Sequence, residues 1–61
     1  MTRKRAERLT GYEIRDIPAA PALAGIGAFD GPNLVCKAEG RSEWMALRHL
    51  VRDMYLPEPT A

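Results

Sequence analysis

The clearest hydrophobic pattern in the chain lies near its C-terminal end, over residues 42–56. At about 100° per residue, five apolar side chains share one helical face. These are Ala46, Leu47, Leu50, Val51 and Met54. The Ser42 hydroxyl can cap the first turn, and Pro57 ends the pattern. The spacing therefore predicts an amphipathic helix over 42–56 and a tail over 57–61.

Residues 11–39 are predicted to form strands and turns, and two runs within them, 12–17 and 34–39, alternate with the two-residue period of strands. Tyr12–Ile17 alternates apolar and charged side chains, and a Pro-Ala-Ala-Pro tetrad ends it. The next two runs, 23–29 and 34–39, flank an Asp-Gly-Pro-Asn cluster, which favours a hairpin. Two glycines weaken the first run, so a loop there is the alternative.

Residues 1–10 are predicted to be a basic N-terminal arm or a short helix. Thr2 would be the N-cap of such a helix, and Gly11 the left-handed residue that ends it. Only Ala6 and Leu9 offer apolar contacts, so this helix would be weak on its own.

These elements predict a single small α+β domain over 1–61, with two layers and a two- or three-stranded antiparallel sheet packed by the C-terminal helix. The predicted core is Tyr12, Ile14, Leu23, Ile26, Phe29, Leu34, Cys36, Leu47, Leu50, Val51 and Met54. That core is thin, because a chain near 60 residues buries only about 60% of its unfolded surface. A homodimer or another partner would supply further burial.

Composition narrows the class of protein. The chain is 46% apolar and 28% charged, which is too hydrophobic for general disorder. A single cysteine excludes an internal disulfide and a cysteine-rich zinc site, so we expect a reducing, cytoplasmic location. Prolines and glycines interrupt the longest uncharged stretch, 17–29, which is too short to span a membrane.

Charge is distributed unevenly although the net charge is only +1. The first eight residues hold four basic side chains and one acidic side chain, whereas residues 9–61 hold five basic and seven acidic ones. The basic residues of the arm are Arg3, Lys4, Arg5 and Arg8. Such an arm can contact the phosphates of a nucleic acid, although short terminal charge runs are more often solvated tails.

No residue pattern predicts catalysis, a cofactor or a metal. Cys36 and His49 are the only thiol and imidazole. Cys36 is predicted on the apolar face of its strand and His49 on the polar side of its helix, so the two side chains should point away from each other. The glycine run over 25–31 superficially matches a dinucleotide-binding loop, but a turn-forming cluster follows it instead of a helix. We therefore predict that the protein is not an enzyme and has no cofactor.

The polar side of the 42–56 helix is the candidate binding surface. Its residues are Met45, Arg48, His49 and Arg52, with Trp44 and Tyr55 at the edge. This side lacks lysine, and arginine beside methionine and aromatic rings is typical of protein interfaces. The alternatives are a merely solvated charge stripe and an edge-of-core tryptophan.

The junction Ala38-Glu39-Gly40-Arg41-Ser42, running into Ala46, resembles the last strand-to-helix junction of double-stranded-RNA-binding domains. In that family a glycine and a serine precede basic residues that contact phosphate. Glu43 and Trp44 stand where the family has lysines, which departs from the phosphate-binding pattern.

Together these observations predict a non-catalytic protein–protein interaction module. It would be a small inhibitor or adaptor, similar in its small size and low cysteine content to phage-type proteins that bind a larger host or defence complex. The alternative is a small nucleic-acid-binding regulator that uses the basic arm and the helix arginines. Neither prediction involves a membrane.

Overall fold

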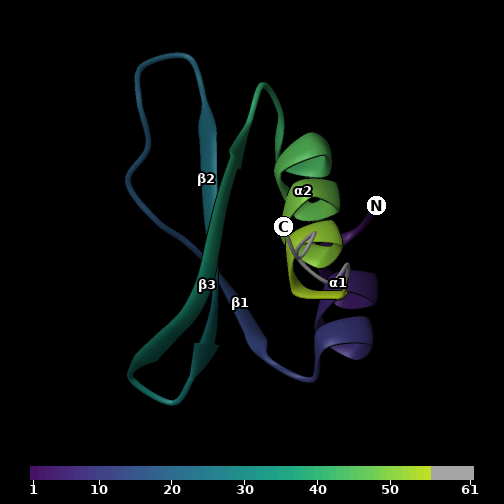
Figure 1. Cartoon of the computed structure of the whole chain (residues 1–61). Coiled ribbons are helices and arrows are strands. Elements are labelled where there is room, and N and C mark those ends of the chain that lie inside the picture. Colours follow the sequence, from purple (N-terminus) through teal and green to yellow (C-terminus); the bar gives the residue numbers. More distant parts are fainter. Residues whose placement is uncertain (56–61) are drawn as a thin grey trace, which may run out of the picture.

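The computed structural model describes residues 1–55, which form two helices and three strands. The elements are α1 (Arg3–Thr10), β1 (Glu13–Asp16), β2 (Ala24–Asp30), β3 (Asn33–Gly40) and α2 (Glu43–Tyr55). The strands form one antiparallel sheet in the order β1-β2-β3, and both helices lie on the same side of it (Figure 1). This confirms the predicted α+β fold, and its sheet has three strands.

The N-terminal segment is a helix rather than an extended arm. The Thr2 hydroxyl accepts a hydrogen bond from the Arg5 backbone N–H (3.2 Å), as a capping residue does. Gly11, at φ 75°, ends α1 in the left-handed conformation and donates its N–H to the Glu7 carbonyl (2.8 Å). The predicted tail over 57–61 lies outside the described residues.

The predicted hairpin forms from β2 and β3, with Asp30 opposite Asn33 at its end. The alternative of a loop before this turn is wrong, because β2 includes Gly25 and Gly27. A Cβ atom at Gly27 would lie 2.7 Å from the Leu34 side chain. Gly27 therefore leaves room for neighbouring side chains to cross the outer face of the sheet, and Gly25 leaves room for the backbone of Ile17.

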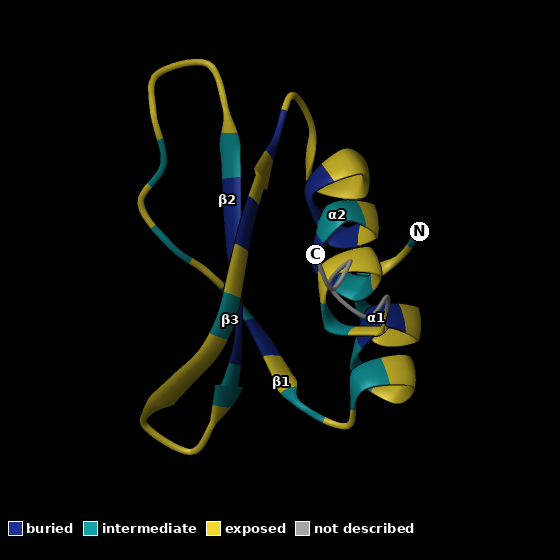
Figure 2. Cartoon of the chain, in the orientation of Figure 1, coloured by how far each residue is buried: buried dark blue, intermediate teal, exposed yellow. Residues whose placement is uncertain are grey.

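The core lies between the sheet and the helices, and four of its eight buried residues are alanines (Figure 2). Its buried residues are Ala6, Ile14, Ile26, Ala28, Ala38, Ala46, Leu47 and Leu50. The assignment of Leu23 and Leu34 to the core is wrong, since they are 38% and 47% exposed. Leu34 pairs with Phe29 on the outer face of the sheet, where no helix covers them.

A side chain from each helix bonds to a backbone group on an outer strand of the sheet. The N–H of Ile14 in β1 donates to the Glu7 carboxylate of α1 (3.0 Å). On β3, the Glu39 carbonyl accepts from Nδ1 of His49 on α2 (2.9 Å). Unpaired strand edges attract other strands, so these bonds reduce the capacity of the sheet to add one.

The Glu7 bond gives a direct test of this arrangement. We expect Glu7→Ala to lower the free energy of unfolding by about 1 to 2 kcal/mol, because the partly buried Ile14 N–H loses its acceptor. Alanine is a better helix former than glutamate, so the gain in helix propensity offsets part of this loss of stability. Urea unfolding followed by circular dichroism measures it.

Glu7→Gln is the matched control, since glutamine keeps an acceptor oxygen at the same position. Its loss in free energy of unfolding should be less than half of the loss in Glu7→Ala. Equal losses in the two variants would contradict a role for the hydrogen bond.

Candidate functional site

A hollow of about 590 Å³ lies on the outer side of α2. Its lining residues are Met1, Met45, Arg48, His49, Val51, Arg52 and Tyr55. Five of the six residues predicted to bind a partner therefore line one depression. Trp44, the sixth, does not line it.

Local rules position the α2 residues of this hollow. The Ser42 hydroxyl accepts the Met45 N–H (3.3 Å) and so fixes where the helix begins. Met45, His49 and Arg52 then follow at helical spacing, which gathers them on one side. Met1 reaches the same hollow because α1 packs against α2.

His49, predicted on the polar side of the helix, is half-buried and bonded to the sheet. Its Nδ1 lies 2.9 Å from the Glu39 carbonyl oxygen, which can only accept a hydrogen bond. Nδ1 must therefore carry a proton. This bond anchors the imidazole ring at one wall of the hollow.

Trp44 and Arg48 form a stacked pair beside the hollow. The Arg48 guanidinium lies 5.0 Å from the centroid of the indole ring, within cation–π range. The Trp44 residue is 52% exposed, so part of its surface remains open to a partner. Stacking holds the Arg48 side chain next to the hollow with its charge in solvent.

Among residues 1–55, the side chains that line the hollow include basic ones and no acidic one. Arg52 has Asp53 at 3.6 Å, and both side chains are more than half exposed, so the attraction is weak. Within residues 1–55, Arg48 has no acidic partner within salt-bridge distance. Partial desolvation lowers the pKa of the Met1 amino group, and the positive charges of Arg48 and Arg5 lower it further.

The four predicted nucleic-acid-binding residues fall into two groups. Arg3 pairs with Asp16 of β1 (2.7 Å) and with Glu43 at the start of α2. These carboxylates, Glu43 first, raise the pKa of its guanidinium, so Arg3 joins three elements of the fold.

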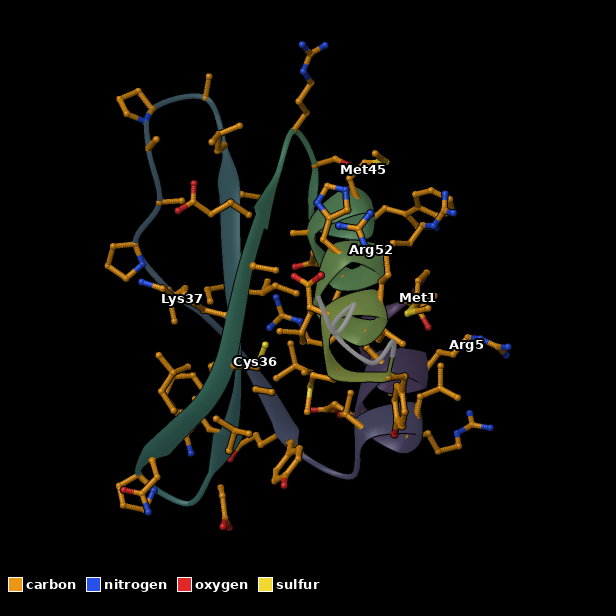
Figure 3. The ribbon with its side chains drawn as sticks, in the orientation of Figure 1. Met1, Arg5, Cys36, Lys37, Met45 and Arg52 are labelled. Atoms are coloured by element: carbon orange, nitrogen blue, oxygen red, sulfur yellow. The ribbon has the colours of Figure 1, made fainter. Side chains whose placement is uncertain are left out.

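Lys4, Arg5 and Arg8 are exposed on α1 and form no ion pair within residues 1–55. Figure 3 shows Arg5 pointing outward from the helix layer, on the same side of the molecule as Met1. Lys37 lies on the opposite side, beyond the sheet. Arg5 of α1 therefore lies on the side of the molecule that carries Met1, a lining residue of the hollow.

The remaining chemical groups do not converge on a site. Cys36 is half-buried and faces the helix layer (Figure 3). Among residues 1–55, no group of three or more His, Cys, Asp or Glu side chains could hold a metal ion. In the same part of the chain, neither helix has the length and apolar character needed to span a bilayer.

The junction that resembles double-stranded-RNA-binding domains is a strand-to-helix junction, with β3 ending at Gly40 and α2 starting at Glu43. Glu43 uses its carboxylate for the ion pair with Arg3. Trp44 holds the Arg48 guanidinium. Neither residue supplies the positive charge that phosphate binding at this junction requires.

Sequence patterns did not identify two lining residues of the hollow, Met1 and Val51. Val51 lies at the margin of the apolar face, where a small rotation of the helix decides between core and surface. Met1 has no local signal, because its place depends on the packing of α1 against α2.

Comparisons of the chain with protein-family models, curated proteins and solved structures found no match.

Proposed function

We propose that this protein is a non-catalytic interaction domain that binds a larger protein through the hollow on α2. The supporting observation is that the hollow combines apolar walls with basic side chains. Met45 and Tyr55 expose large apolar surfaces there, at 38% and 55%. Arg48 and Arg52 carry their charges next to them. Binding sites with an apolar centre and an arginine rim are typical of protein recognition.

The size of the domain fits a role as an inhibitor or adaptor. A compact body with a Cα radius of gyration of 11.2 Å can cover one site on a larger complex without adding chemistry of its own. An interface on one protein surface typically buries about 800 Å². The hollow and the surrounding exposed side chains of α2 offer a surface on which such a contact can be centred.

Site-specific photocrosslinking tests the proposed surface. A photoreactive residue replacing Met45 should crosslink to one protein in cells of the native source, because Met45 lines the hollow. The double change Arg48→Glu and Arg52→Glu should reduce that crosslink about tenfold or more.

A photoreactive residue replacing Lys37 is the matched control, since Lys37 lies on the far side of the sheet. Equal crosslinking from both positions, or no effect of the double arginine change, would refute the assigned surface. Nuclease treatment before capture removes contacts that depend on nucleic acid.

Nucleic-acid binding is the second candidate function. The observation that favours it is the exposed basic row of Lys4, Arg5 and Arg8 on α1. Phosphate contacts predict an affinity that falls steeply with salt. A gel-shift assay with duplex and single-stranded DNA or RNA at low salt would show no complex if this role is wrong.

A further inference from the structure

Two of the three acidic side chains of the helices are engaged within the fold, and the third, Asp53, is only weakly attracted to Arg52. Glu7 accepts the Ile14 N–H, and Glu43 pairs with Arg3. Asp53 lies beside Arg52. The helices hold six basic and three acidic side chains, whereas residues 11–42 hold three basic and four acidic ones. Positive charge is therefore concentrated on the helix side of the molecule.

The basic groups of α1 and α2 act on the same region of space. Arg5 of α1 and Arg48 of α2 both lower the pKa of the Met1 amino group, after the effect of partial desolvation. Met1 itself lines the hollow. Arg5 of α1 and the basic lining of the α2 hollow thus belong to one positive surface with an apolar depression in it.

This arrangement distinguishes between two kinds of anionic partner. A nucleic acid presents phosphates and flat bases, and single strands gain much of their affinity by stacking on aromatic rings. The Trp44 ring is stacked with Arg48 outside the hollow. Among the described lining residues, Tyr55 supplies one aromatic ring, whereas Met1, Met45 and Val51 supply thioether and aliphatic groups. Such walls suit an aliphatic or aromatic side chain of a protein.

We propose that the partner contributes an acidic segment that lies across α1 and α2, with an apolar side chain in the hollow. This inference rests on the proposed function, because it specifies the chemistry of the protein bound at that site. The carboxylates of the segment pair with Arg48 and Arg52 beside the hollow and with Arg5 on α1. Arginine suits this role, because its planar guanidinium binds a carboxylate through two hydrogen bonds.

Fluorescence anisotropy with defined peptides tests the inference. The probe is a short labelled peptide in which pairs of glutamates alternate with leucine. The matched peptide has every glutamate replaced by glutamine, and the third probe is single-stranded DNA of similar length. We expect the glutamate peptide to bind the intact domain at least about tenfold more tightly than the glutamine peptide.

Three charge reversals then locate the contact. Arg48→Glu should weaken binding of the glutamate peptide about tenfold or more, because it reverses a charge at the hollow. Arg5→Glu should weaken it about threefold and reduce its salt dependence, as expected for a charge at the rim. Lys37→Glu makes the same charge change across the sheet and should alter affinity less than about twofold.

Arg48→Gln removes the positive charge without adding a negative one, so it separates the loss of attraction from repulsion. Circular dichroism shows whether each variant is folded. Its loss of affinity should be smaller than that of Arg48→Glu. Equal affinity for the glutamate and glutamine peptides would overturn the inference, as would an unchanged affinity in Arg5→Glu. Tighter binding of DNA than of the glutamate peptide would instead identify a nucleic acid as the anionic partner.

The crosslink from position 45 distinguishes failure of this inference from failure of the proposed function. If the crosslink to a protein persists but the glutamate peptide does not compete for it, the proposed function stands and the acidic segment is wrong. If no protein crosslinks at position 45, the proposed function itself is wrong.

Discussion

Replacing Leu50 with alanine is expected to lower the free energy of unfolding by roughly 3 to 5 kcal/mol, which is the range for a leucine truncated in a closed core. Leu50 is fully buried between α2 and the sheet. A domain of this length has a total stability of only about 3 to 9 kcal/mol. Leu50→Ala should therefore leave a large unfolded fraction at room temperature, measurable by urea unfolding followed by circular dichroism.

Leu9→Ala is the matched control, because it makes the same chemical deletion on the exposed side of α1. Leu9 is 42% exposed, so its truncation leaves no closed cavity and should cost less than about 1 kcal/mol. Similar losses from the two leucines would mean that Leu50 does not lie in a close-packed core.

Replacing Gly40 with alanine is expected to be the next most damaging change. A Cβ atom at position 40 would lie 2.7 Å from the backbone nitrogen of Ala46 and 3.0 Å from the Cβ atom of Met45. The first of these atoms belongs to the backbone of α2, so no side-chain rotation relieves the clash. We expect a loss of about 3 kcal/mol, at the upper end for overpacking, and a shift of the first turn of α2.

Gly31→Ala controls for effects that any glycine replacement would produce. Position 31 has open space around it but a φ of 59°, so alanine meets conformational strain alone and should cost about 1 kcal/mol. Chemical shifts of Met45 should change in Gly40→Ala and remain unchanged in Gly31→Ala. A Gly40→Ala domain as stable as the original would contradict the close contact of β3 with α2.

Local rules predicted the elements of the fold well. Thr2 and Ser42 cap the two helices with their hydroxyl groups, and Gly11 ends the first. The alternation from Tyr12 to Ile17 contains β1. These signals depend on residues close together in the sequence, and they are the kind that a single sequence contains.

The composition of the core was harder to predict, because it depends on how closely the two layers approach. Ranking residues by hydrophobicity selected Leu23 and Leu34, which are exposed, and omitted Ala28 and Ala38, which are buried. Small side chains in the sheet let α2 pack close to it, and that closeness excludes larger ones. Alanine has no sequence signal for this role, since it is common at every depth.

The binding surface was predicted to the extent that helical spacing defines it. Met45, Arg48 and Arg52 share one side of α2 because of their spacing alone. The bond from His49 to Glu39 joins residues ten positions apart in different layers, and Met1 enters the hollow from another helix. Neither feature could be predicted without the positions of the layers.

Within residues 1–55, the separation of charge between the two layers creates an electric dipole directed from the sheet toward the helices. The helices hold three more basic than acidic side chains, while residues 11–42 hold one more acidic than basic. In the field of an acidic partner, this dipole turns the helices toward that partner before contact. Added salt should therefore slow association more than it shortens the lifetime of the complex, and Lys4 and Arg8 would contribute to the rate without touching the partner.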